Sequence, residues 1–130
     1  MNYNQALSEY RQVNIHTSVE GASPHKLISL LLHGFNTRVA EAKVAMLNEK
    51  TELKGEKISK ALDILSGLRS ALNFEAGKEI ATKLDDLYDY MSRQLVAANA
   101  GNDIDKCDEV IGLMAVIQSA WDEIREVESV

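Results

Sequence analysis

The sequence predicts an all-α protein: an antiparallel four-helix up-down bundle with a short N-terminal helix and an extended arm packed on it. The chain has one proline in 130 residues, few aromatic residues and many Leu, Ala, Glu and Lys, a composition that favours helix. Apolar residues recur at helical spacing in four successive segments, and no stretch alternates for long enough to predict a strand. Four such helices joined by short turns pack most simply as an antiparallel bundle, because each needs its apolar stripe covered by neighbours.

The first helix is expected to begin at Ser23-Pro24 and to end near Asn48. Serine is a favoured N-cap because its hydroxyl accepts a hydrogen bond from the backbone of the first turn, and proline suits the first helical position. The apolar stripe of this helix comprises Leu27, Leu31, Phe35, Ala42 and Met46.

The other three helices are expected over residues 52–74, 78–99 and 104–127. Gly77 is expected to separate the second helix from the third, and Gly101 to end the third, because glycine is a poor helix former and a frequent C-terminal stop. The stripe of the third helix comprises Ile80, Leu84, Leu87, Tyr88, Met91, Leu95 and Ala98. The stripe of the fourth comprises Cys107, Val110, Ile111, Met114, Ile117, Trp121 and Ile124.

We expect a single domain with two parts, residues 1–22 and residues 23–130. A chain of this length fits one ordinary domain and can bury a core without disulfides or metals. Residues 2–10 are expected to form the short helix. The residues after it are β-branched, polar and irregular, which predicts an extended arm laid on the bundle.

Composition excludes some functions and indicates the cellular compartment. The net charge of −6, from 20 acidic and 14 basic residues, argues against nucleic-acid binding, which usually needs a basic patch. The lysines at 50, 54, 57 and 60 are mixed with glutamates and are interpreted as a solvated helix face. A single cysteine suits a reducing compartment, and the chain shows neither a signal peptide nor an apolar run that predicts membrane insertion. We therefore expect a cytoplasmic protein.

The sequence shows few residue patterns typical of catalytic or metal-binding sites. The three histidines show neither a His-x-x-x-His pair nor a Glu-x-x-His motif, and no glycine loop or nucleophile elbow is present. Cys107 lies on an apolar stripe and is interpreted as buried and inert. Asp85, Asp86 and Asp89 alternate with basic residues and are interpreted as a solvated face. We expect no catalytic activity, no cofactor and no metal.

The remaining signal is excess apolar surface. At about 100° per residue, Leu30 falls on the polar side of the first helix, and Tyr90 is displaced from the stripe of the third. Leu113 and Ile117 widen the stripe of the fourth helix beyond what a simple core needs. Together these residues predict grooves that receive the chain's own arm, another copy or a foreign amphipathic helix. That these side chains merely cover one another or the arm is an equally weighted interpretation.

Three stretches resemble a known family in order and spacing: "ASPHKLISLL", "SALNFEAGKEIATKLDDLYDYMSRQLVAAN" and "EVIGLMAVIQSAW". The chain resembles the FliS family of flagellar secretion chaperones, and the runs Ser23 to His25 and Leu87 to Met91 are specific when found together. The resemblance implies a cytoplasmic, non-enzymatic chaperone that binds the disordered C-terminal segment of flagellin in apolar grooves. Such binding prevents premature polymerisation and delivers flagellin to the flagellar export apparatus.

The resemblance also implies where partners bind. Candidates for the flagellin grooves are Leu27, Leu30, Leu31, Gly34, Tyr90, Leu113 and Ile117. Leu7 and Tyr10 match a pair implicated in docking to the export gate, a membrane protein with a cytoplasmic domain. A homodimer is a further expectation. The chain departs from the family pattern at His33, where an acidic residue is frequent, at Asn73, where aspartate is frequent, and at Lys78, where glycine is common.

Two alternatives stay open at this point. Histidine phosphotransfer bundles expose a histidine followed by lysine and glycine three and four positions later, and neither His25 nor His33 fits that pattern. A self-associating structural bundle is the other alternative, and its sign would be association without a partner.

Overall fold

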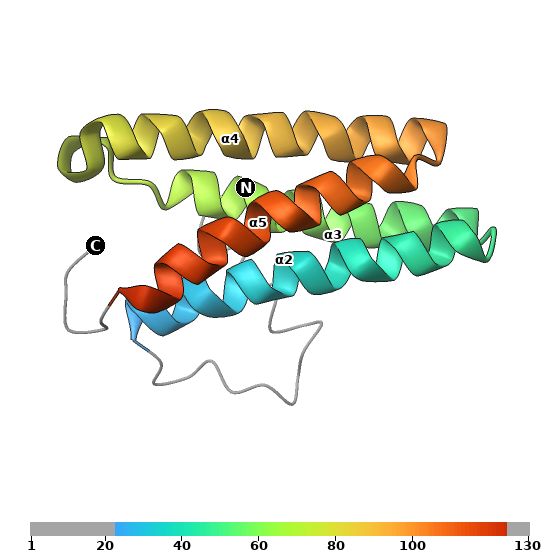
Figure 1. The fold of residues 1–130 in the computed structure, drawn as a ribbon, viewed down its shortest axis with the longest axis horizontal. Helices are drawn as coiled ribbons and strands as arrows, with labels where there is room; N and C mark the ends of the chain where they lie inside the picture. The colour runs from blue at the N-terminus through green and yellow to red at the C-terminus, as the bar shows by residue number, and fades with distance from the viewer. Residues whose placement is uncertain (1–22, 125–130) are drawn as a thin grey trace.

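The structure, a computed structural model, describes residues 23–124 as four helices without a strand among them. They are α2 (Pro24–Leu47), α3 (Thr51–Ser70), α4 (Phe74–Gly101) and α5 (Ile104–Glu123). Helix α2 packs against α3 and α5, and α4 packs against the same two helices, so the four form a closed ring (Figure 1). This confirms the all-α class and is compatible with the up-down bundle. The expected short helix over residues 2–10 and the arm lie outside the described residues.

Polar side chains cap the starts of three helices. The Ser23 hydroxyl accepts a hydrogen bond from the backbone N–H of Lys26 at 3.1 Å, which confirms the predicted N-cap of α2. Asn73 Oδ1 accepts from the N–H of Ala76 at 3.0 Å, and an Asp103 carboxylate oxygen accepts from the N–H of Lys106 at 3.3 Å. Each cap satisfies one of the backbone donors that the first turn of a helix leaves unpaired.

The predicted break beside Gly77 is confirmed at Lys78, but the predicted end of the second helix and start of the third were wrong. Helix α3 ends at Ser70 rather than at residue 74, and α4 begins at Phe74 rather than at Lys78. The reason is the Asn73 cap, which starts a new helical turn that continues through Gly77, whose N–H donates to the Asn73 carbonyl at 2.8 Å. The discontinuity falls inside α4 at Lys78, whose backbone has φ 48° and ψ −120°.

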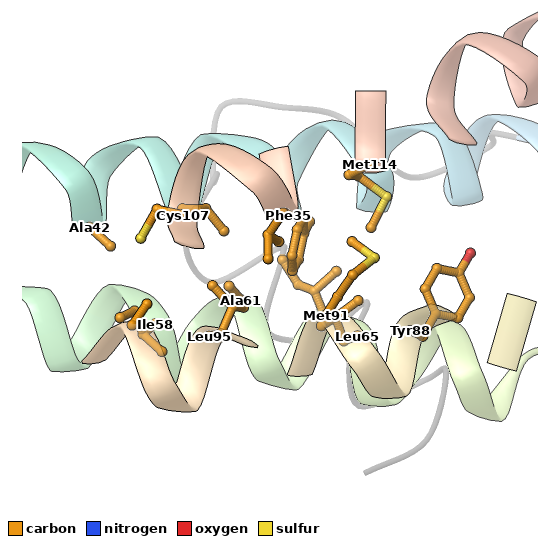
Figure 2. Close-up of a cluster of buried hydrophobic side chains, with 14 of the residues drawn as sticks. Phe35, Ala42, Ile58, Ala61, Leu65, Tyr88, Met91, Leu95, Cys107 and Met114 are labelled. Atoms are coloured by element: carbon orange, nitrogen blue, oxygen red, sulfur yellow. The ribbon is translucent and has the colours of Figure 1, made fainter. Parts of the chain in front are cut away.

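The core is built by all four helices (Figure 2). Its largest fully buried side chains are Leu31, Leu32, Phe35, Val39, Ile58, Leu65, Met91, Leu95, Cys107, Val110 and Met114. Burial of Cys107 was predicted and is confirmed; its Sγ lies 3.9 Å from Met46 Sδ, and burial raises the pKa of the thiol. An interior filled by side chains from every helix fixes the positions of the surfaces described below.

Two polar groups expected on solvated faces instead join helices. Lys54 is buried, and its ammonium donates to the carbonyl of Asn99 at 2.9 Å and to Asn102 Oδ1 at 3.3 Å. Asp85 accepts a bond from Arg69 Nε at 2.7 Å across the α3–α4 interface. That hydrogen bond holds the pKa of Asp85 below its usual range and raises the pKa of Arg69. The solvated-face interpretation fails here because helical spacing does not show which flank of a helix a neighbour covers.

Candidate binding surface

Helix α5 contacts α4 and α2 in different ways along its length. Side-chain hydrogen bonds between α4 and α5 converge on Glu109, near the start of α5. Contacts with α2 continue to the end of α5: Lys43 pairs with Asp108, and the Ser29 hydroxyl donates to Asp122 at 3.1 Å. Figure 1 shows the result, with α5 leaving α4 near their connecting turn and crossing toward the start of α2.

Tyr90, Gln94 and Glu109 form what we call the Glu109 clamp. The Tyr90 hydroxyl lies 2.9 Å and 3.0 Å from the two carboxylate oxygens of Glu109, and Gln94 Nε2 donates to the same carboxylate at 2.8 Å. The bonds from Gln94 and Tyr90 lower the pKa of Glu109, and the Glu109 carboxylate raises the pKa of the Tyr90 phenol. The clamp joins α4 to α5 where the two helices begin to separate.

His25 and Trp121 join the start of α2 to the end of α5, in what we call the His25–Trp121 latch. The two rings stack with centroids 4.9 Å apart and an interplanar angle of 10°. Each residue also donates to the other's backbone: His25 Nε2 to the Trp121 carbonyl at 2.9 Å, and Trp121 Nε1 to the His25 carbonyl at 3.0 Å. The fold thus brings together two of the stretches on which the resemblance rests.

Where α4 and α5 separate, the apolar stripe of α4 loses its cover. Toward the clamp its side chains are buried, from Tyr88 to Ala98. Toward the start of α4, Leu84 and Leu87 are half-buried, and Ile80, on the same arc of the helix, is 70% exposed. An exposed isoleucine on the core-facing arc marks the point at which the neighbouring helix no longer covers it.

The second half of α5 is apolar on the side that faces α4. Leu113 and Ile117 are half-buried there, and Val116, one turn from Leu113, is 70% exposed. We call the combined surface the diverging face. It comprises Ile80, Leu84, Leu87, Leu113, Val116 and Ile117.

The predicted groove residues fall on two surfaces rather than one. Tyr90, Leu113 and Ile117 lie at the α4–α5 side, at or beside the diverging face. Leu27 and Leu30 lie on the flank of α2 that also carries Glu41, whose carboxylate is 3.5 Å from Lys57 of α3.

Three of the expected positions on α2 differ in their exposure. The expectation that Leu30 lies on the polar side of its helix was wrong: it is half-buried and packs against the core, because α3 covers that flank. Leu31 is fully buried in the core, and Gly34 is buried as well. Leu7 and Tyr10 lie outside the described residues.

Sequence reasoning missed Val116 and the exposure of Ile80. Ile80 carried a signal, since it belongs to the predicted stripe of the third helix, but nothing local shows that the stripe is uncovered at that end. It also missed the latch and the clamp, because their members are far apart in sequence: 96 residues separate His25 from Trp121.

Other kinds of site find little support in the described part of the chain. A shallow, open depression on α5 is lined by Ala115, Gln118, Ser119, Asp122 and Glu123, all from one helix. Residues 23–124 hold no group of three His, Cys, Asp or Glu side chains placed to share a metal ion. No helix within the same residues has the length and apolarity needed to cross a bilayer.

Comparison with known proteins decides the family. Residues 6–128 match the family model described as flagellar protein FliS. The chain belongs to the FliS family. It is 46% identical to the flagellar secretion chaperone FliSB of Pseudomonas aeruginosa over 120 residues, which cover 92% of this chain and 95% of that protein.

Two further relatives carry the name flagellar secretion chaperone FliS. The protein of Vibrio cholerae is 42% identical over 119 residues, covering 92% of this chain and 88% of its own length. That of Salmonella typhimurium is also 42% identical over 119 residues, covering 91% and 88%. The FliS family is thus one of secretion chaperones rather than of enzymes, and the diverging face is a surface of a chaperone bundle.

Proposed function

We propose that this protein is a cytoplasmic export chaperone that binds the disordered C-terminal segment of flagellin on the diverging face. The observation that carries the proposal is Ile80, which lies on the core-facing arc of α4 yet is 70% exposed. On the flank of α5 that faces it, Val116 is 70% exposed as well. Membership of a family of flagellar secretion chaperones supplies the class of partner.

The diverging face suits an amphipathic guest helix. Such a guest presents apolar anchors at positions i, i+3, i+4 and i+7, which match a surface lined by two helices that separate. Burying about 1,000 Å² of apolar area is worth roughly 25 kcal/mol before costs. Ordering the guest and immobilising it offset most of that gain. The balance favours a complex that forms readily and releases its cargo.

A second contact is proposed on the flank of α2 that carries Leu27 and Leu30. Both side chains are half-buried and border the core, so an extended part of the guest covers them without entering the bundle. Leu31 and Gly34 lie behind this flank and support it from within. A guest that reaches both surfaces wraps around the bundle, a mode open to disordered segments.

Two further proposals concern delivery and assembly. Leu7 and Tyr10 are proposed to dock on the export gate, on the strength of the resemblance alone. The free chaperone is proposed to form a homodimer when no guest covers its apolar surface, since uncovered apolar patches of this kind favour association. Sedimentation of the free protein and of its 1:1 mixture with guest peptide checks the second point.

The proposed binding is tested by calorimetry with a synthetic peptide of the flagellin C-terminal segment. Ile80→Asp is expected to weaken binding by at least tenfold, about 1.4 kcal/mol, because a carboxylate on the diverging face must be desolvated by the guest. The heat-capacity change of wild-type binding is expected to be clearly negative.

Val96→Asp is the matched control. Val96 lies on the same helix, is 57% exposed and stands on a different side of α4 from Ile80. It should bind the peptide as the wild type does. Equal loss in both variants, or no binding by the wild type at tens of micromolar, contradicts the proposal.

Phosphotransfer through a histidine is disfavoured by geometry. His25 is buried, stacked on Trp121 and hydrogen-bonded to its carbonyl, so its ring is not presented to a partner's phosphoryl group. His33 is exposed but lacks the lysine and glycine that follow the reactive histidine of such bundles.

A further inference from the structure

Helix α5 is tied to α4 by the Glu109 clamp near its start and to α2 at several points along its length. The His25–Trp121 latch is one of the ties to α2 near the end of α5. The clamp and the latch are 12 residues apart, or roughly 18 Å along a helix. Because α5 keeps its contacts with α2 but leaves α4 after the clamp, the diverging face is the surface that this separation uncovers.

The latch gives the end of α5 partners that a place beside α4 would not supply. The Trp121 carbonyl accepts from the backbone N–H of Ile124 at 3.0 Å, and His25 Nε2 supplies a second donor to it at 2.9 Å from another helix. The indole N–H returns a bond to α2, and the ring stack adds an aromatic contact. One residue further, Asp122 accepts from Ser29 at 3.1 Å.

The exposed apolar side chains of α4 and α5 favour movement of the end of α5 in the opposite direction, toward α4. Ile80 and Leu84 on α4, and Val116 and Ile117 on α5, would leave water if the end of α5 leaned toward α4. Apolar attraction is non-directional and grows with the area removed from water. The hydrogen bonds and the ring stack of the latch oppose this attraction. They lie near the end of α5, the part that would move furthest toward α4.

We propose that the His25–Trp121 latch keeps the diverging face open by holding the second half of α5 on α2. His25 is then a positioning residue for guest binding, although it does not touch the guest. The effect on binding rests on the proposed function; the effect on helix spacing does not. Without the latch, the end of α5 moves toward α4 and covers the apolar surface.

The test measures helix spacing and binding in the same variants. Spin labels are placed at Glu79→Cys on α4 and Ser119→Cys on α5, both exposed positions, with Cys107→Ala removing the native thiol. In His25→Ala the distance between the labels is expected to shorten. If the closed form then holds about nine-tenths of the molecules, the affinity for the flagellin peptide falls about tenfold.

His25→Phe separates the ring stack from the hydrogen bond. It keeps a ring against Trp121 but removes the bond from Nε2 to the Trp121 carbonyl, so the label distance and the affinity should lie between those of the wild type and those of His25→Ala. A merely structural role for His25 would lower the thermal midpoint in both variants without moving the label distance.

The outcomes separate the inference from the proposed function. An unchanged label distance in His25→Ala overturns the latch. A shortened distance together with a wild type that does not bind the peptide supports the latch and contradicts flagellin binding. If His25→Ala does not fold, His25→Phe is read alone: it is expected to shorten the distance to a smaller extent, and no change there overturns the inference.

Discussion

The ammonium of Lys54 lies 2.9 Å from the carbonyl oxygen of Asn99, so the first turn of α3 closes the last turn of α4. The carbonyls at the end of a helix carry partial negative charge and lack intrahelical donors. Lys54 also donates to Asn102, the left-handed residue that ends α4. One buried cation thereby serves both the backbone and the side chain of this helix end.

Lys54→Met is expected to destabilise the bundle by about 1–3 kcal/mol, because it leaves the Asn99 carbonyl without its donor in a partly buried site. Chemical denaturation at neutral pH measures the change. Lys83→Met, on the exposed surface of α4, should stay within about 0.5 kcal/mol of the wild type. Equal effects of the two substitutions would show that Lys54 contributes no more than a surface lysine.

Lys78→Gly is expected to stabilise the protein by about 1 kcal/mol. Lys78 holds φ 48° and ψ −120°, a conformation that glycine adopts freely and that costs other residues about 1–3 kcal/mol. Thermal unfolding measures the gain. The neighbouring Gly77→Ala should act in the opposite direction, since its Cβ would lie 2.9 Å from Ala81 Cβ.

Asp85→Asn is expected to reduce stability by about 0.5–1 kcal/mol at pH 7, the usual range for a half-exposed pair. The Arg69 guanidinium lowers the pKa of Asp85, so the folded state binds this proton less readily than the unfolded state. The contribution is therefore present above the ordinary carboxyl pKa and is lost as the pH falls through the lowered one. Unfolding curves between pH 2 and pH 7 should converge for wild type and variant at the acid end. Asp86→Asn, exposed on the same turn, should follow the wild type throughout.

Tyr88 is expected to ionise at a higher pH than an ordinary tyrosine. Burial raises its pKa to about 12. Because the folded state prefers the neutral phenol, stability is unaffected below pH 10 and falls as the pH rises toward 12. Absorbance titration resolves this phenol from the chain's other three tyrosines, and Tyr88→Phe should remove the late step. A titration without such a step in the native protein contradicts the burial of this ring.

Local signals predicted much of the fold. The Ser23 cap, the burial of Cys107 and the all-helical class follow from side-chain chemistry and spacing within a few turns, and all three are confirmed. The break expected beside Gly77 is present at Lys78. The second helix was expected to run too far because the Asn73 cap, which starts a separate helical turn ahead of that break, was not recognised.

The candidate surface was predictable in kind but not in place. Excess apolar residues on the third and fourth helices predicted apolar surface left outside the core, and Leu113 and Ile117 are part of the diverging face; binding of a guest there stays a prediction. The prediction that Leu30 lies on a polar face failed because periodicity gives a residue's angle on its own helix. It does not show which flank of that helix a neighbouring helix covers. The exposure of Ile80 depends on the crossing of α5, which contacts far apart in sequence determine.

The core side chains Phe35, Leu65, Met91 and Met114 are fully buried by the bundle itself, and the inner members of the diverging face, such as Leu113, pack against this core. A bundle that is already folded before it meets cargo loses little conformational entropy on binding, so the cargo bears nearly the whole ordering cost. Under the proposed function, a pull on one end of the bound segment then detaches it stepwise, while the chaperone keeps its fold.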